Sequence, residues 1–184
     1  MVELVLRELE VRDEHEARKA HSEFPDWEFL LSFDQVDEYC SSEQKLDSDR
    51  ISWAQYVENC RKMRMGIDLP KGRVPATFFI AEVDGQLVGR SSIRHELNTF
   101  LLNYGGHIGY GVRPAFRRRG YATEILRQSL TYIRRLGVGD VLITCFDENV
   151  GSATVIETCG GELENFVELE GRPLRRYWIR NKDL

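Results

Sequence analysis

The sequence lacks the segments by which proteins enter or cross a membrane. No apolar run approaches the roughly 18 residues that a membrane-spanning helix needs. The first residues contain neither the cationic nor the apolar stretch of a signal peptide. The four cysteines are scattered, without a C-x-x-C pair. We therefore expect a cytoplasmic protein with reduced cysteines and no membrane partner.

The sequence also lacks a net positive charge, which argues against one class of partner. The 184 residues include 25 basic and 30 acidic side chains, for a formal net charge of −5. Proteins that bind duplexes usually present a broad basic face, so we expect no nucleic-acid partner. Residues 1–50 hold 15 acidic and 6 basic side chains. This acidic excess is either a solvated surface or a means of attracting a cationic amine.

Two common phosphate-binding motifs, G-x-x-x-x-G-K-[ST] and G-x-G-x-x-G, are missing. Three consecutive arginines nevertheless occupy residues 117–119, where a strand-like run passes into a helical pattern. A helix N-terminus exposes unpaired N–H groups and the positive end of the helix dipole, so it attracts phosphate. Gly120 lets the backbone approach an anion closely. This segment is thus predicted to be an anion site.

The spacing of apolar residues predicts a single α/β domain over residues 1–184. The expected strands cover residues 2–9, 76–83, 87–97, 107–112 and 140–146, followed by a closing hairpin over 160–180. The expected helices cover residues 14–23, 52–65, 117–136 and 149–159. We also expect a hairpin around residues 97–104. Gly109 and Gly111 suggest a bulge in the strand that contains them.

A family resemblance rests on residues 112–122. Their sequence VRPAFRRRGYA resembles the acetyl-CoA-binding signature of the GNAT superfamily of N-acetyltransferases, V-x-P-x-x-[RQ]-x-x-G-x-[GA]. The following ITCFDENVGSATVIETCGG resembles the next block of that superfamily, and RHELNTFLLNYGGHIGY resembles a group of uncharacterised bacterial acetyltransferases within it. The resemblance implies the GNAT (acyl-CoA N-acyltransferase) fold, a mixed and mostly antiparallel sheet of about six to seven strands flanked by about four helices.

The resemblance also implies a binding site for acetyl-CoA and no metal. The strand backbone would hold the pantetheine arm, the loop would hold the pyrophosphate, and Asn149 would contact the pantetheine side. Charged side chains of Arg113, Arg118 and Arg119 would reach the 3′-phosphate. The expected cofactor-binding residues are Tyr110, Gly111, Val112, Arg117, Arg118, Arg119, Gly120, Tyr121, Ala122 and Asn149.

The implied chemistry is attack of an amine on the thioester, for which a base must take a proton. The candidate catalytic residues are His107, His95 and Tyr110. For each histidine the alternative is a hydrogen-bonded structural role. Many relatives place a tyrosine acid where this chain has Ile156, so Tyr110 or Tyr177 would have to serve, or the thiolate leaves without a proton from the protein.

The acceptor is expected to be an amine of a small molecule or a peptide. Acceptor pockets in this fold come from a variable helical region, here residues 24–75, and a homodimer is a further expectation. The departure at Ile156 motivates one alternative from another functional class. It is a catalytically decayed acyl-CoA-binding or regulatory protein on the same fold.

Overall fold

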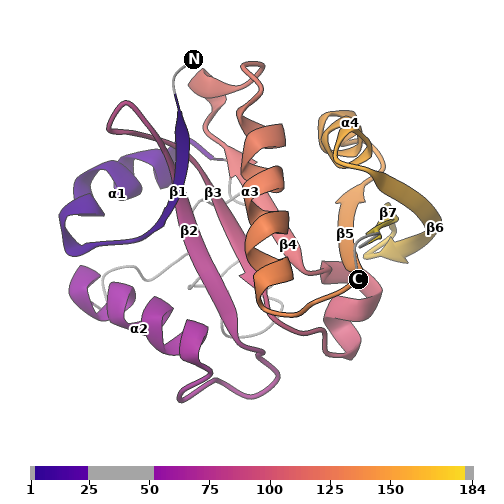
Figure 1. Cartoon of the computed structure of the whole chain (residues 1–184), viewed down its shortest axis with the longest axis horizontal. Coiled ribbons are helices and arrows are strands. Elements are labelled where there is room, and N and C mark those ends of the chain that lie inside the picture. The colour runs from indigo at the N-terminus through magenta and orange to yellow at the C-terminus, as the bar shows by residue number, and fades with distance from the viewer. Residues whose placement is uncertain (1–2, 25–51, 181–184) are drawn as a thin grey trace.

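The described residues fold into two antiparallel sheets that lie beside each other (Figure 1). The structure is a computed structural model, and it describes residues 3–24 and 52–180. The strand order is β1-β2-β3-β4 in the first sheet and β5-β7-β6 in the second. The strands are β1 (Leu4–Glu8), β2 (Ala76–Val83), β3 (Gln86–Arg94), β4 (Ile108–Val112), β5 (Val141–Phe146), β6 (Gly161–Leu169) and β7 (Arg172–Ile179).

The α-helices of the described residues begin and end close to the positions that the sequence predicts. They are α1 (Glu14–Ser22), α2 (Trp53–Met65), α3 (Tyr121–Arg135) and α4 (Val150–Thr158). Ser52 Oγ accepts the Gln55 N–H at 3.2 Å and so caps α2. Asn149 Oδ1 caps α4 in the same way, through the Ser152 N–H at 3.0 Å. None of the described helices is long and apolar enough to cross a membrane.

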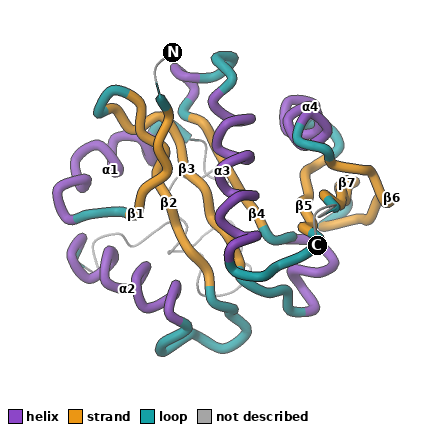
Figure 2. The backbone as a smooth tube through the Cα atoms, viewed as in Figure 1, coloured by secondary structure: helices purple, strands orange, loops and turns teal. Residues whose placement is uncertain are grey.

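The helices cover both faces of the four-stranded sheet, as the tube in Figure 2 traces. On one face, Phe78 and Ile80 of β2 pack with α1 and with Trp53 and Tyr56 of α2. On the other face, Phe79 of β2 packs in a larger cluster with α3, α4 and the second sheet. Neighbouring residues of β2 thus face opposite layers, as the alternation of a strand requires. We refer below to the α1/α2 face and the α3 face of this sheet.

Strand β4 pairs with β3 in an unbroken register. Ser91 lies opposite Tyr110, and the paired residues run from Gly89 with Val112 to Ile93 with Ile108. The predicted bulge at Gly109 and Gly111 is therefore wrong for this pairing. The described register shifts lie between β2 and β3 and between β6 and β7.

The predicted hairpin around residues 97–104 is also wrong. The chain there forms a π-helical turn, η3 (Leu101–Gly105). Asn98 explains this difference, because its Oδ1 accepts the Leu101 N–H at 2.9 Å and so starts a helical turn where a strand would need cross-strand partners. Most of the predicted variable region 24–75 is outside the described residues, as are the acidic Asp34, Asp37 and Glu38.

Candidate active site

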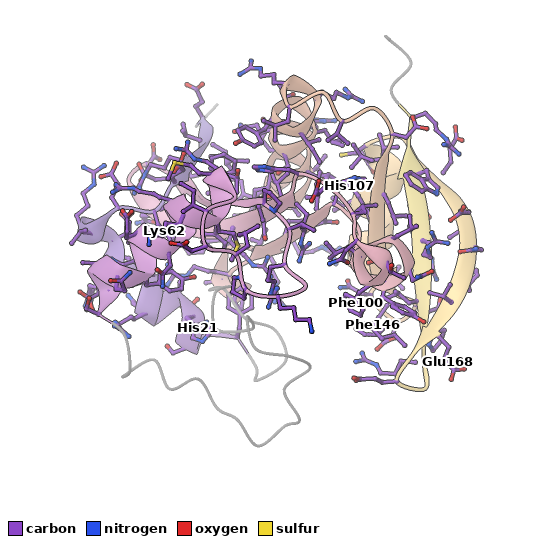
Figure 3. All side chains as sticks on the ribbon, turned by 90° about the horizontal axis from the view of Figure 1, so that it is seen from below. His21, Lys62, Phe100, His107, Phe146 and Glu168 are labelled. Carbon is purple, nitrogen blue, oxygen red and sulfur yellow. The ribbon has the colours of Figure 1, made fainter. Side chains whose placement is uncertain are left out.

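Strands β4 and β5 are joined at their N-terminal ends. The His107 N–H, just before β4, donates to the Leu142 carbonyl of β5 at 2.7 Å. The Leu142 N–H in turn donates to Nδ1 of His107 at 3.0 Å. We call these two bonds the His107 joint, and Figure 3 shows His107 between the larger body of the molecule and the β5–β7 sheet. Beyond the joint the ladder does not continue from β4 to β5, so the strands separate.

The His107 ring is held neutral by its surroundings. The residue is 6% exposed, and burial, with a smaller effect from the charge of Arg94, lowers its pKa to about 4. Because Nδ1 accepts a hydrogen bond, the neutral ring is assigned its proton on Nε2. This geometry supports the structural alternative for His107, and its role as a base stays a prediction.

At the C-terminal end of β4, the chain turns through a loop into α3. Gly120 is the N-cap of this helix, with φ of 82°, and no side chain caps the helix there. A Cβ at Gly120 would have no heavy atom of residues 3–24 and 52–180 within 4 Å, so these residues leave the space beside it open. The first turn of a helix leaves its N–H groups without helical partners. The loop therefore offers free backbone donors and the positive end of a dipole to an anion.

The arginine run folds back along this loop. Arg117 Nε donates to the Val112 carbonyl at 3.1 Å, and Arg119 donates to the Ala115 carbonyl at 3.1 Å. Arg119 also lies over the Phe116 ring, 5.4 Å from its centroid. Arg118 and Arg119 both remain exposed at the start of α3.

Arg113 is directed elsewhere, so its predicted contact with a 3′-phosphate is wrong. It is 5% exposed, and its guanidinium donates to the Leu87 carbonyl at 2.8 Å. Its Nε donates to Glu23 at the end of α1, also at 2.8 Å, and this partner raises its pKa. A long-range ion pair thus uses Arg113 to fix α1 to the first sheet.

The Tyr110 hydroxyl crosses from β4 to α4. It lies 2.9 Å from Ser152 Oγ and donates to the Ser152 carbonyl at 3.3 Å. Burial raises the pKa of Tyr110, so the phenol keeps its proton near neutral pH. The structure therefore brings Tyr110 close to the helix that begins at Asn149.

The residue at the usual acid position lies away from solvent. Ile156 is fully buried and packs in the core with Tyr177. The Tyr177 hydroxyl donates to Glu157 at 2.9 Å and accepts from Arg175 at 3.4 Å. Tyr177 is thus engaged on the β7 side of α4, whereas Tyr110 reaches α4 from β4.

His95 lies apart from the other predicted catalytic residues. Its Nε2 is 2.8 Å from Thr77 Oγ1, which is 2.9 Å from the Tyr132 hydroxyl of α3. Burial lowers the pKa of His95, so the ring is neutral near pH 7. Tyr110 pairs with Ser91, four residues and thus roughly 13 Å along β3 from His95. A catalytic role for His95 stays a prediction.

Two arginines of β3 lie against β4. Sequence reasoning marked Arg94, in the segment RHELNTFLLNYGGHIGY, without assigning it a role, and it missed Arg90. A Cβ at Gly109 would fall 3.1 Å from Arg94 and 3.7 Å from Arg90. A Cβ at Gly111 would fall 3.9 Å from Arg90 Nε. The glycines that suggested a bulge instead leave room for these side chains. The available signal was alternation, because Arg90 and Arg94 share one face of their strand.

Comparison with known proteins agrees with this architecture. A search of curated proteins finds no match, whereas solved structures match over nearly the whole chain. RimJ of Mycobacterium smegmatis, in complex with CoA-disulfide, is 20% identical with a TM-score of 0.71, over 98% of this chain and 83% of that one. The protein yncA of Salmonella typhimurium, solved with its cofactor acetyl-CoA, is 12% identical with a TM-score of 0.61, over 98% and 95%.

A third similar structure is the spermidine/spermine N-acetyltransferase SpeG of Vibrio cholerae, in mutant forms. It is 19% identical with a TM-score of 0.61, over 97% of this chain and 95% of that one. At these identities the likeness shows the fold. The family profile described as acetyltransferase (GNAT) domain matches residues 4–162, which include the separated strands, the loop at Gly120 and α4. The chain therefore belongs to the GNAT acetyltransferase family.

Proposed function

We propose that the protein transfers the acetyl group of acetyl-CoA to the amine of a small molecule or peptide. The observation that carries the proposal is the uncapped N-terminus of α3, which follows a strand whose ladder stops at its outer edge. Free N–H groups and a glycine with open space beside it suit a pyrophosphate. The structures of RimJ and yncA, which contain CoA-disulfide and acetyl-CoA, give the proposal further support.

The described residues fit acetyl-CoA along one path. The N–H groups of residues 118–122 would hold the pyrophosphate, since that of Arg117 donates to the Pro114 carbonyl at 3.3 Å. Arg118 and Arg119 would hold the 3′-phosphate. Among the described residues, the outer edge of β4 at residues 110–112 has no strand partner, so its backbone would bond the amides of the pantetheine arm. Asn149 would lie on the other side of that arm, at the start of α4. When bound, acetyl-CoA supplies an activated acyl thioester.

Within this site we assign Tyr110 the role of hydrogen-bond donor to the leaving sulfur. Its raised pKa keeps the phenolic proton in place, and its hydroxyl already spans from β4 to α4. The proton of the amine would go to water or to one of the two histidines. His95 and His107 remain candidates, each neutral near pH 7.

Substitution of Tyr110 tests this assignment. Tyr110→Phe is expected to lower kcat roughly 10- to 100-fold, because a donor to the leaving group is lost, while acetyl-CoA affinity is retained. The measurement is CoA release with a panel of amino acids, polyamines, aminoglycosides and peptides. Tyr132→Phe is the matched control, since its hydroxyl bonds Thr77 away from α4. An unchanged kcat in Tyr110→Phe contradicts the role.

The same panel tests the function itself. Release of CoA that depends on an added amine supports acetyl transfer. Tight binding of acetyl-CoA without turnover on any acceptor would instead favour the decayed acyl-CoA-binding alternative. The pH profile of kcat/KM in His95→Asn and His107→Asn tests the base. An acidic limb that neither substitution alters would make both histidines structural.

A further inference from the structure

Two arginines of β3 project from the α1/α2 face of the first sheet. Ile80 pairs with Arg90 and Phe78 with Ser92, and both apolar residues pack against α1 and α2. Paired residues of neighbouring strands project on the same face, and so do alternate residues of one strand. Arg90 and Arg94 therefore lie on the face that the predicted acceptor region covers, opposite α3.

The two guanidinium groups converge over β4. Both have a nitrogen within 4 Å of the point where a Gly109 Cβ would lie. Arg90 also donates to the Gly109 carbonyl at 3.3 Å, so its side chain follows the β4 backbone. Side chains at 109 and 111 would occupy this space. Glycine leaves it to the two arginines at position 109 and to Phe24 and Arg90 at position 111. Tyr110 lies between the two glycines, but its side chain projects on the α3 face, as does its partner Ser91. The arginine pair and the Tyr110 side chain therefore lie on opposite sides of the β4 segment proposed to hold the pantetheine arm.

The surroundings of this pair favour a negatively charged ligand. Burial lowers the pKa of Arg90 and of Arg94 to about 10, and further cations oppose them: Arg94 acts on Arg90, and Arg73 on Arg94. Both guanidiniums stay charged at neutral pH. The carboxylates of Glu16 and Glu23 on α1 are already paired with Arg113. Over residues 3–24 and 52–180, no ion pair is formed by Arg94.

We propose that Arg90 and Arg94 bind a carboxylate of the acceptor, so that the substrate is an amine that also carries a carboxylate. This proposal rests on the proposed acetyl transfer. Two guanidinium groups facing one volume can hold both carboxylate oxygens through charge-assisted bonds. The amine of a short amino acid or of an acidic peptide would then lie at the outer edge of β4, across the strand from the Tyr110 side chain. Polyamines, on which SpeG acts by its name, would be repelled by the same two charges.

Matched acceptor pairs test the proposal. Each pair differs in the carboxylate alone: an amino acid and its amide, or a dipeptide and its C-terminal amide. We expect kcat/KM from CoA release to favour the carboxylate member by about 100-fold, as loss of a charge-assisted pair predicts. In Arg90→Gln and Arg94→Gln this preference should fall to a few-fold, mainly through KM, with acetyl-CoA affinity unchanged. Arg135→Gln, an exposed change on α3, is the control.

A second readout separates this proposal from the proposed function. Calorimetric binding of the same amino acids in the absence of acetyl-CoA should be lost in Arg94→Gln and partly kept in Arg94→Lys, whether or not the enzyme turns over. Turnover without a preference for the carboxylate member overturns the arginine site and leaves acetyl transfer intact. If Arg94→Gln does not fold, Arg94→Lys carries the test, since an unchanged preference and unchanged binding in that variant contradict bidentate recognition.

The same measurements test an alternative ligand for Arg90 and Arg94. An acidic side chain of residues 25–51 would neutralise the arginines from within the chain. In that case no carboxylate acceptor would bind the wild-type protein more tightly than its amide. That result would overturn the proposal.

Discussion

The two ends of the β4–β5 pair differ in how they are held. At the start of the strands the His107 joint links residues 35 positions apart, and it is buried. At the far end each strand leads into a helix, and the features there are local: the open Gly120, the exposed arginines and the Asn149 cap. Long-range contacts thus hold the strands together where they meet, and short motifs shape the end where a ligand is proposed to bind.

The largest expected effect is the loss of the His107 joint in acid. The pKa of His107 is about 4 when folded and 6.5 by its ordinary value. Between these pH values the unfolded chain binds a proton that the folded chain does not. The free energy of unfolding contributed by His107 is therefore intact above pH 6.5 and falls by about 3 kcal/mol towards pH 4. Urea unfolding from pH 4 to 8 measures it.

Two variants isolate this contribution from other titrating groups. His107→Asn keeps an acceptor for the Leu142 N–H but does not titrate, so its stability should fall less steeply in acid than that of the wild-type protein. His15→Asn changes an exposed histidine and should follow the wild-type protein. If the free energy of unfolding falls equally with pH in His107→Asn and in the wild-type protein, protonation of His107 does not contribute to the loss of stability.

A somewhat smaller loss of stability is expected on substitution of Arg113, which follows β4 and fixes α1 to the first sheet. Arg113→Gln leaves Glu23 and the Leu87 carbonyl without their partner, at an expected cost of about 2–3 kcal/mol in the free energy of unfolding. Arg64→Gln breaks an exposed pair with Glu8 and should cost under about 1 kcal/mol. Acetyl-CoA affinity should not change in either variant. Weaker acetyl-CoA binding in Arg113→Gln, but not in Arg64→Gln, would show that Arg113 contributes to cofactor binding and would contradict a purely structural role.

At the ligand end, Gly120→Val should raise the Kd for acetyl-CoA about 30-fold, equivalent to about 2 kcal/mol. The side chain would cover the N–H groups of the first turn of α3. Gly137→Val is the matched control, because Gly137 lies just past the other end of α3 with φ of 83° and equally open space. Both variants carry the same backbone strain, so equal changes in Kd would contradict the cradle at Gly120.

The smallest effect is expected from the exposed arginines. Replacing Arg118 and Arg119 together by glutamine should weaken acetyl-CoA binding about fivefold, since exposed ion pairs contribute little. The loss should shrink at high salt and disappear with 3′-dephospho-acetyl-CoA. An equal loss for both ligands would place the arginines at the pyrophosphate.

Local signals allowed much of the fold to be predicted from the sequence. Asn149 and Gly137 mark helix ends in the sequence, because capping depends on a few neighbouring residues. The family signature located the loop at Gly120 for the same reason. The start of α3 was predicted four residues early, since the positive φ of Arg118 delays the helix until Tyr121.

Contacts between distant residues could not be predicted in this way. The sequence placed Arg113 with its neighbours Arg118 and Arg119, but its partner Glu23 is 90 residues away. The contact of Gly109 with Arg90 and Arg94 was equally unpredictable, because both arginines belong to another strand. The dense arginine run was conspicuous in the sequence, whereas the convergent pair becomes visible only through strand register.

Glycine at positions 109 and 111 leaves the α1/α2 face of β4 without side chains there. This separates cofactor binding from acceptor selection, two tasks that many enzymes combine in one segment. On the proposed assignments, the backbone of β4 recognises the cofactor, while β3 supplies the side chains that select the acceptor. Positions 90, 92 and 94 could then vary, through evolution or in a designed library, without a change in the strand that reads acetyl-CoA. A new acceptor specificity would require substitutions in one strand and leave the family signature untouched.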